Sequence, residues 1–226
     1  MPQALQSVWI TQVMQEDGTM DFPLGQPVTK GGAIRPLAER MRPHSLNEVI
    51  GQDHLLGNGC LLPKLIRENR VGNLIFAGPP GTGKTSLATV IAMEGSCKLL
   101  KVNAVTSNVA ELRETLKLAK YHGAETCYLF VDEIHRFNKA QQDALLPHVE
   151  QGTVVLIGAT TENPSFEANS ALLSRCRVLV LEELGESELS LILDRALSDP
   201  QKGLGELGVG LDSGARSALL DAAEGD

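Results

Sequence analysis

The chain has 226 residues, 42% hydrophobic and 21% charged, which is enough for one large domain with a substantial core. A formal net charge of −8 argues at first against a nucleic-acid partner, but the whole excess lies in residues 182–226, which hold 11 acidic and 3 basic residues. Residues 1–181 hold 17 of each kind, so the net charge neither supports nor excludes DNA.

Two further features exclude other classes of protein. The longest apolar stretches are far shorter than a membrane span, and the first residues lack the pattern of a secretory signal. The four cysteines are widely spaced and form no CxxC pair. We therefore expect buried thiols in a reducing compartment and no membrane partner.

In chain order, residues 1–33 come first, and we expect a flexible lead-in because glycine and proline leave them little periodicity. Short apolar runs then predict strands at residues 73–77, 99–102, 127–131, 154–158 and 177–181. Helical patterns are found at residues 82–92, 109–121, 139–148, 186–196 and 213–224. Strands that alternate with helices predict an α/β fold whose parallel sheet is covered on both faces.

A phosphate-binding motif follows the first predicted strand. Residues 78–85 match GxxxxGK[ST] and open a predicted helix, which disfavours a chance glycine-rich turn. Glycines let backbone N–H groups face a phosphate, while Lys84 is placed to reach the β- and γ-phosphates and Thr85 to bind Mg²⁺. The expected nucleotide contacts are Gly78, Pro79, Pro80, Gly81, Thr82, Gly83, Lys84, Thr85 and Ser86.

Two adjacent acids end the third predicted strand. Carboxylates at a strand end are costly unless they face a metal or water, so Asp132 is predicted to help hold Mg²⁺ through ordered water. Glu133 is predicted to polarise the attacking water, which favours hydrolysis over transfer to a bound acceptor. The alternative is an ordinary acidic pair at the start of the next helix, a weaker interpretation beside the phosphate-binding motif.

Several segments carry a family resemblance. They are residues 39–43 (ERMRP), 49–52 (VIGQ), 132–143 (DEIHRFNKAQQD), 158–167 (GATTENPSFE) and 174–176 (SRC). Together with the phosphate-binding motif, they resemble the AAA+ ATPases of the clamp-loader clade. The detail of residues 135–143 and 158–167 is similar to the replication-associated recombination protein A family, related to the Werner-helicase-interacting protein. The resemblance covers residues 34–226.

The resemblance implies a P-loop NTPase fold: a three-layer sandwich with a five-stranded parallel sheet. It assigns residues 34–182 to the α/β core and 183–226 to the beginning of an α-helical lid that is expected to be truncated. Because the family continues into a longer lid and an oligomerisation domain, the chain is expected to be a fragment. Arg216 lies too early to be the sensor-2 arginine.

The resemblance also implies roles for single residues. Thr160 matches the sensor-1 position, with Asn163 as a second candidate. Arg175 matches the arginine finger that acts on a neighbour's ATP, the alternative being a surface cation. The segment around the adenine is represented by Arg42, Pro43, Ile50, Gly51 and Gln52. Asn103 is a candidate for gating Glu133, and His135 is interpreted as structural because no second metal-ligand spacing accompanies it.

The implied function is an ATPase that uses ATP and Mg²⁺, is stimulated by DNA, and acts at stalled replication forks and in recombination and repair. The implied partners are DNA junctions or ends, further copies of the chain (a tetramer in the full-length protein), and a single-stranded-DNA-binding protein or other replisome components. The expected location is the bacterial cytoplasm with the nucleoid, or a eukaryotic nucleus. DNA binding rests on the family alone, because aromatics make up only 4% of the chain and no basic cluster is interleaved with them.

A different class of function stays open. The chain would then be a nucleotide-gated scaffold that binds ATP and recruits replication partners with negligible hydrolysis. A small-molecule kinase is disfavoured by the adjacent Asp132 and Glu133. A GTPase is disfavoured because Ala140 and Gln141 follow Asn138-Lys139, where an acidic residue would read guanine.

Overall fold

A computed structural model describes residues 35–121, 126–163 and 170–223 of the chain; the lead-in expected for residues 1–33 lies outside them. The described residues contain a five-stranded sheet in which every pairing is parallel. Its strands are β1 (Leu74–Ala77), β2 (Lys98–Asn103), β3 (Cys127–Asp132), β4 (Val155–Thr160) and β5 (Arg177–Val180), in the order β2-β3-β4-β1-β5. The predicted parallel α/β sheet is confirmed.

The helices of the described residues range from four to 13 residues in length. They are α1 (Leu37–Arg40), α2 (Asp53–Leu56), α3 (Leu61–Arg67), α4 (Lys84–Glu94), α5 (Val109–Tyr121), α6 (Lys139–Glu150), α8 (Ser170–Leu173), α9 (Glu186–Ser198) and α10 (Ser213–Ala223). Short 3₁₀ turns are η2 (Leu46–Glu48), η3 (Ile134–Arg136) and η4 (Gly205–Leu207). In this part of the chain, no helix is long and apolar enough to cross a membrane.

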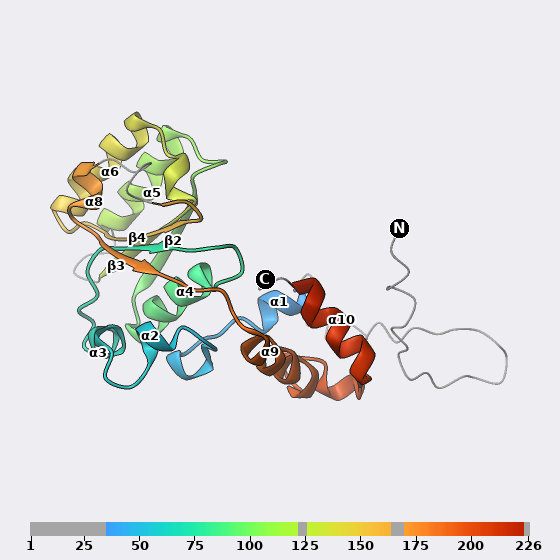
Figure 1. Cartoon of the computed structure of the whole chain (residues 1–226). Coiled ribbons are helices and arrows are strands. Elements are labelled where there is room, and N and C mark those ends of the chain that lie inside the picture. Colours follow the sequence, from blue (N-terminus) through green and yellow to red (C-terminus); the bar gives the residue numbers. More distant parts are fainter. Residues whose placement is uncertain (1–34, 122–125, 164–169, 224–226) are drawn as a thin grey trace. The chain divides into compact units, whose positions relative to one another are not determined.

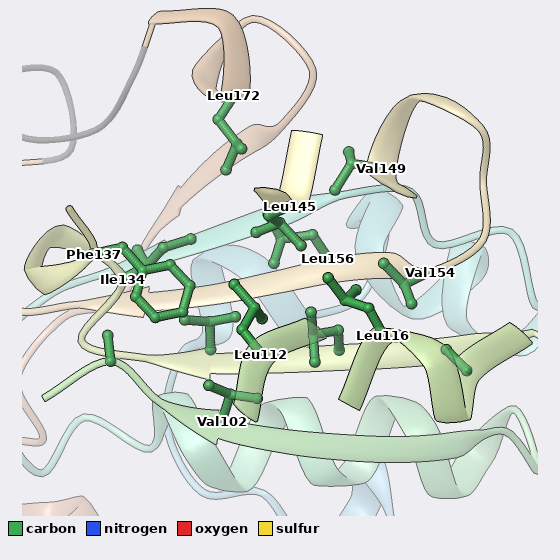
Figure 2. Packing of buried hydrophobic residues seen from close by; sticks show 14 of the residues in the cluster. Val102, Leu112, Leu116, Ile134, Phe137, Leu145, Val149, Val154, Leu156 and Leu172 are labelled. Carbon is green, nitrogen blue, oxygen red and sulfur yellow. The ribbon is translucent and has the colours of Figure 1, made fainter. Parts of the chain in front are cut away.

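The sheet is covered on both faces (Figure 1). Alternate residues of β3 point to opposite sides, because successive side chains of a strand face opposite ways. Leu129 and Val131 join one cluster with α5, α6 and α8, while Tyr128 and Phe130 join the other with α3 and α4. Figure 2 shows the first cluster, in which Leu112, Leu116, Leu145 and Leu156 are buried together. These two clusters make the central unit a three-layer sandwich.

The chain divides into two compact units. One is Pro43–Leu184, which contains the sheet, and the other combines Met1–Arg42 with Gly185–Asp226. In the second unit, α10 is tied to α9 by Arg216, whose guanidinium binds the Asp194 carboxylate at 2.6 and 2.8 Å. Arg216 also contacts the hydroxyl of Ser190, one turn earlier on α9. These contacts give Arg216 a structural role, in which it joins α9 and α10.

Two local features differ from the sequence expectations. The helix predicted from residue 82 begins at Lys84, because Gly83 adopts φ +90° as its N-cap and leaves Thr82 in the loop. Of the four free cysteines, Cys127 is buried as expected, whereas Cys60, Cys97 and Cys176 are partly exposed.

Candidate nucleotide-binding site

The polar ends of three neighbouring strands meet at the carboxyl edge of the sheet. The order β3-β4-β1 places Asp132, Thr160 and Gly78 on adjacent strand ends, with Ala77 opposite Thr160 in the register. The backbone N–H of Gly78 donates to the carbonyl of Thr160 at 3.2 Å. Crevices outside the carboxyl ends of parallel strands are the usual ligand sites of open α/β sheets. The candidate site therefore lies here.

Residues 78–85 form an open loop at the start of α4. Gly81 and Gly83 have φ of 73° and 90°, a conformation that favours glycine. A Cβ built on Gly83 would find no atom within 4 Å, whereas one on Gly78 would lie 2.3 Å from the carbonyl oxygen of Leu181. Glycine thus allows close packing at Gly78 and leaves space at Gly83. Backbone amides at a helix N-terminus, facing open space, are suited to bind an anion.

Lys84 lies across this loop. Its side chain is largely buried, and Nζ donates to the carbonyls of Gly78 at 2.7 Å and Pro79 at 2.5 Å. The hydroxyl of Thr82 also donates to the Pro79 carbonyl, at 3.0 Å. The ammonium group of Lys84 is therefore bound by carbonyl oxygens of the loop itself. Thr85, next to Lys84 in the first turn of α4, is partly buried.

The acidic pair lies on the neighbouring strand end. Burial raises the pKa of Asp132, the nearby Glu133 carboxylate raises it further, and Lys84 opposes the rise. The partly buried carboxylates of Asp132 and Glu133 repel each other when both are charged, and a bound cation would offset this repulsion. Among the described residues, no cluster of three or more His, Cys, Asp or Glu side chains could hold a metal ion alone. A carboxylate such as Asp132 and a hydroxyl such as Thr85 are oxygen ligands of the kind Mg²⁺ takes, one or two from the protein and the rest from phosphates and water.

Glu133 has a strained backbone. Its φ of 53° and ψ of 48° are left-handed, which costs a non-glycine residue about 1–3 kcal/mol and is typical of functional sites. The carboxylate is partly exposed, and its Oε2 accepts from the hydroxyl of Thr161 at 3.4 Å and lies 3.2 Å from Nδ1 of His135. The turn directs this carboxylate back toward the end of β4.

His135 lies between the ends of β3 and β4. Its ring is only 5% exposed, and Nδ1 lies 2.8 Å from the hydroxyl oxygen of Thr160. Nε2 lies 3.4 Å from Oε1 of Glu162. Thr160 is fully buried, and its hydroxyl oxygen accepts the N–H of Glu162 at 3.0 Å. The sequence did not indicate that His135, Thr161 and Glu162 lie at the site. The pattern around His135 shows no metal-ligand spacing, and its place beside Glu133 depends on the 3₁₀ turn η3.

The segment expected around the adenine is tied to the phosphate-binding loop by Gln52. The side-chain amide of Gln52 donates to the carbonyls of Thr82 at 3.3 Å and Glu182 at 2.7 Å, and its oxygen accepts the Glu182 N–H at 3.0 Å. Gln52 and Gly51 both have positive φ, of 62° and 76°. Ile50 and Pro43 are partly buried in the same unit. Arg42 belongs to the other unit, where it pairs with Glu39 at 3.2 Å.

Arg175 lies at the opposite, amino edge of the sheet. It lies two residues before the start of β5, and its carbonyl accepts from the side chain of Asn73, which directly precedes β1. The guanidinium binds Glu150 at 2.6 Å and the carbonyl of Ala171 at 2.6 Å. The structure therefore does not bring Arg175 together with the other predicted catalytic residues of the same chain.

The two asparagine candidates have different surroundings. Asn103 is opposite Asp132 in the register of β2 and β3, and its side-chain oxygen accepts the N–H of Val105 at 2.9 Å. Asn163 is exposed and follows Glu162 at the end of the described segment. The oxygen of Asn103 is thus engaged with its own loop and not with the Glu133 carboxylate.

Comparison with known proteins shows which family the chain resembles. Residues 74–184 match the ATPase family associated with various cellular activities (AAA). Replication-associated recombination protein A of Haemophilus influenzae is 49% identical over 193 residues, covering 84% of this chain and 43% of that protein. The chain belongs to the replication-associated recombination protein A family of AAA+ ATPases.

Other members and neighbours agree. Replication-associated recombination protein A of Escherichia coli K12 is 48% identical, covering 85% of this chain and 44% of that protein. ATPase WRNIP1 of Dictyostelium discoideum is 42% identical, over 87% of this chain and 23% of that protein. The Thermotoga maritima RuvB Holliday junction branch migration motor superposes with a TM-score of 0.60 at 32% identity, over 70% of this chain and 54% of that one. The chain thus spans less than half the length of these family members.

Proposed function

We propose that this chain is the nucleotide-hydrolysing core of a DNA-stimulated ATPase that acts at stalled replication forks and in recombination and repair. The observation that supports it most is the carboxyl edge of the sheet, where an open anion-binding loop, Lys84 and the acidic pair lie on neighbouring strand ends. The relatives named for replication-associated recombination, and the structural neighbour named as a branch migration motor, fit the same process.

In this proposal, the backbone amides of residues 78–85 and the Lys84 ammonium bind the β- and γ-phosphates of ATP. The hydroxyl of Thr85 and, through ordered water, the carboxylate of Asp132 would hold Mg²⁺, and the bound cation would supply positive charge beside the phosphates. Glu133 polarises the attacking water from a backbone turn that fixes its direction. Ser86, which follows Thr85 in the first turn of α4, is proposed as a further nucleotide contact.

Sensing of the γ-phosphate is assigned to the end of β4. Thr160 holds its hydroxyl in the buried contact with His135, while the hydroxyl of the exposed Thr161 faces Glu133. The adenine is assigned to Pro43, Ile50, Gly51 and Gln52, and Gln52 acts there by positioning, because both ends of its amide are already bonded.

Arg175 is assigned to the active site of a neighbouring subunit. It lies at the amino edge of the sheet, a strand's length from the phosphate-binding loop of its own chain. A guanidinium supplied by a neighbour would spread the charge on the transferred phosphoryl group. The functional form is therefore proposed to be a homo-oligomer, a tetramer in the longer protein, working on DNA junctions or ends with a single-stranded-DNA-binding protein or other replisome component.

The test is Glu133→Gln, which keeps the shape of the side chain and removes its charge. We expect unchanged binding of Mg·ATP and loss of phosphate release, measured with and without forked DNA in the full assembly. Glu114→Gln on the exposed face of α5 is the matched control, because its only described side-chain partner is Lys117.

Three results decide between the candidate functions. DNA-stimulated turnover in wild type and Glu114→Gln, lost in Glu133→Gln, supports the ATPase. Wild-type turnover in Glu133→Gln removes Glu133 from water activation. ATP binding without turnover in wild-type protein favours the nucleotide-gated scaffold instead.

A further inference from the structure

One buried side chain connects the two strand ends that carry the predicted water-activating and sensing groups. Nδ1 of His135 lies 3.2 Å from Oε2 of Glu133, which follows β3, and 2.8 Å from the hydroxyl oxygen of Thr160, which ends β4. Both oxygens are thus within reach of a single ring nitrogen. The ring is 5% exposed, so water competes little for these contacts.

Packing alone does not account for a histidine at this position. Nε2 is buried without a hydrogen bond among the described residues, although Oε1 of Glu162 lies 3.4 Å away. A buried polar atom that lacks a hydrogen bond costs about 1–3 kcal/mol, so an apolar side chain of similar size would be less costly for stability. Metal binding does not account for it either, because no cluster of potential metal ligands is found in the described part of the chain.

We infer that His135 is a positioning residue that holds the Glu133 carboxylate and the Thr160 hydroxyl in one fixed arrangement through its Nδ1 atom. The ring restrains the direction of the carboxylate that activates water, and a shift of Thr160 on β4 moves the same ring. This inference rests on the proposed ATPase function, in which Glu133 acts on the water and Thr160 responds to the γ-phosphate.

The expected effect is on the rate of hydrolysis and not on nucleotide binding. Misplacing a catalytic group by about 1 Å costs on the order of 100-fold in rate. We therefore expect His135→Ala to lower kcat about 100-fold while the Kd of Mg·ATP stays within about twofold, because His135 has no described contact with residues 78–85.

Two amide variants identify the atom responsible. The side-chain amide of asparagine lies near the position of Nδ1 and that of glutamine near Nε2. His135→Asn should recover most of the lost kcat, whereas His135→Gln should not. His148→Ala on α6 is the matched control, because His148 is also partly buried with an unbonded ring nitrogen but lies outside the site.

A double-mutant cycle and a spectroscopic measurement complete the test. If His135 acts through Thr160, His135→Ala with Thr160→Val should be no slower than the slower single variant. In ¹⁵N NMR of the five histidines, Glu133→Gln should shift the ring signals of His135 and leave those of His148 unchanged.

The inference is overturned if His135→Ala keeps the kcat of His148→Ala, if the rate losses at 135 and 160 multiply, or if Glu133→Gln leaves the His135 signals in place. Failure of the proposed function looks different. The wild-type protein would then bind Mg·ATP without releasing phosphate, and the NMR measurement would still decide whether the ring contacts Glu133.

Discussion

The two edges of the sheet differ in how they use polar side chains. At the carboxyl edge, Lys84 and His135 are largely buried and each has two or more polar neighbours. At the amino edge, Arg175 and Glu150 form a pair whose side chains are 39% and 43% exposed. Both edges thus have charged or polar side chains, but Lys84 and His135 at the carboxyl edge are more deeply buried than Arg175 and Glu150 at the amino edge.

The difference indicates that the two edges of the sheet have different roles. β1 has four residues, so the two edges are separated by about 13 Å of strand, further than an arginine side chain reaches. In the proposed function, one edge binds the phosphates, and Arg175 at the other edge exchanges its contacts with Glu150 and the Ala171 carbonyl for a contact with a different molecule. A head-to-tail arrangement of copies would bring the two edges together, and such heterologous contacts form a ring when the rotation between copies closes.

The largest expected effect comes from removing the cation of the amino edge. Arg175→Ala should lower ATP turnover of the assembly by about 10³–10⁵-fold, the usual value of an arginine finger, without weakening ATP binding. Arg177→Ala, two residues later and also exposed, is the control.

Mixing subunits tests whether Arg175 acts between chains. Lys84→Ala protein lacks a working phosphate site and Arg175→Ala lacks the cation, so mixed assemblies should regain part of the turnover. No recovery on mixing would mean that each chain uses its own Arg175, against the separation of the edges.

A medium effect is expected from the charge enclosed at the carboxyl edge. The pKa of Asp132 is raised above its ordinary value of 3.8, so the ligand-free folded state holds this proton more tightly than the unfolded state does. The stability that comes from the protonated form is present below pH 3.8 and is lost as pH rises through the folded pKa. Asp132→Asn should therefore raise Tm at pH 7, have much less effect at pH 3, and abolish Mg²⁺-dependent ATP binding.

Thermal unfolding at both pH values, with and without Mg·ATP, measures this directly. Asp143→Asn on the exposed side of α6 is the control. A lower Tm for Asp132→Asn at pH 7 would show that the carboxylate stabilises the ligand-free fold, the opposite of what its surroundings indicate.

The smallest effect is expected from the ion pair of the amino edge. An exposed pair contributes about 0–1 kcal/mol, so Glu150→Gln should change Tm by a few degrees at most. Turnover of the assembly should rise by less than about fivefold, because Arg175 loses its ion pair with Glu150 and is held in its own chain mainly by the carbonyl of Ala171. A large fall in turnover would show that Glu150 takes part in the contact between subunits.

Much of the fold could be predicted because its signals are local. The strands are short apolar runs, and the predicted and observed ranges agree within one or two residues, as for β3 at Cys127–Asp132. The central strands β1, β3 and β4 are buried on both faces as expected, whereas β2 and β5, at the two edges of the sheet, are much more exposed. The phosphate-binding loop is likewise a continuous motif. The start of α4 was predicted two residues too early, because the left-handed Gly83 that delays it depends on backbone geometry and not on hydrophobic pattern.

The contacts of the site were harder to predict, because they join segments far apart in sequence. His135 reaches Thr160 only because β3 and β4 are neighbours in the sheet, which the sequence order does not state. The pairing of Arg175 with Glu150 likewise depends on where α6 ends relative to β5. The roles of Glu133, Arg175 and Thr160 stay predictions that the experiments above can test.

The bonds from Gln52 to Glu182 have a consequence for how the protein is made. They join residues 130 positions apart, near the two ends of the central unit. A ribosome exposes Gln52 long before Glu182, so this side chain and its bond to the phosphate-binding loop acquire their last partner only when nearly the whole unit has emerged. Contacts between distant residues also form slowly. Nucleotide affinity should therefore appear late in synthesis, after most of the sheet has been translated.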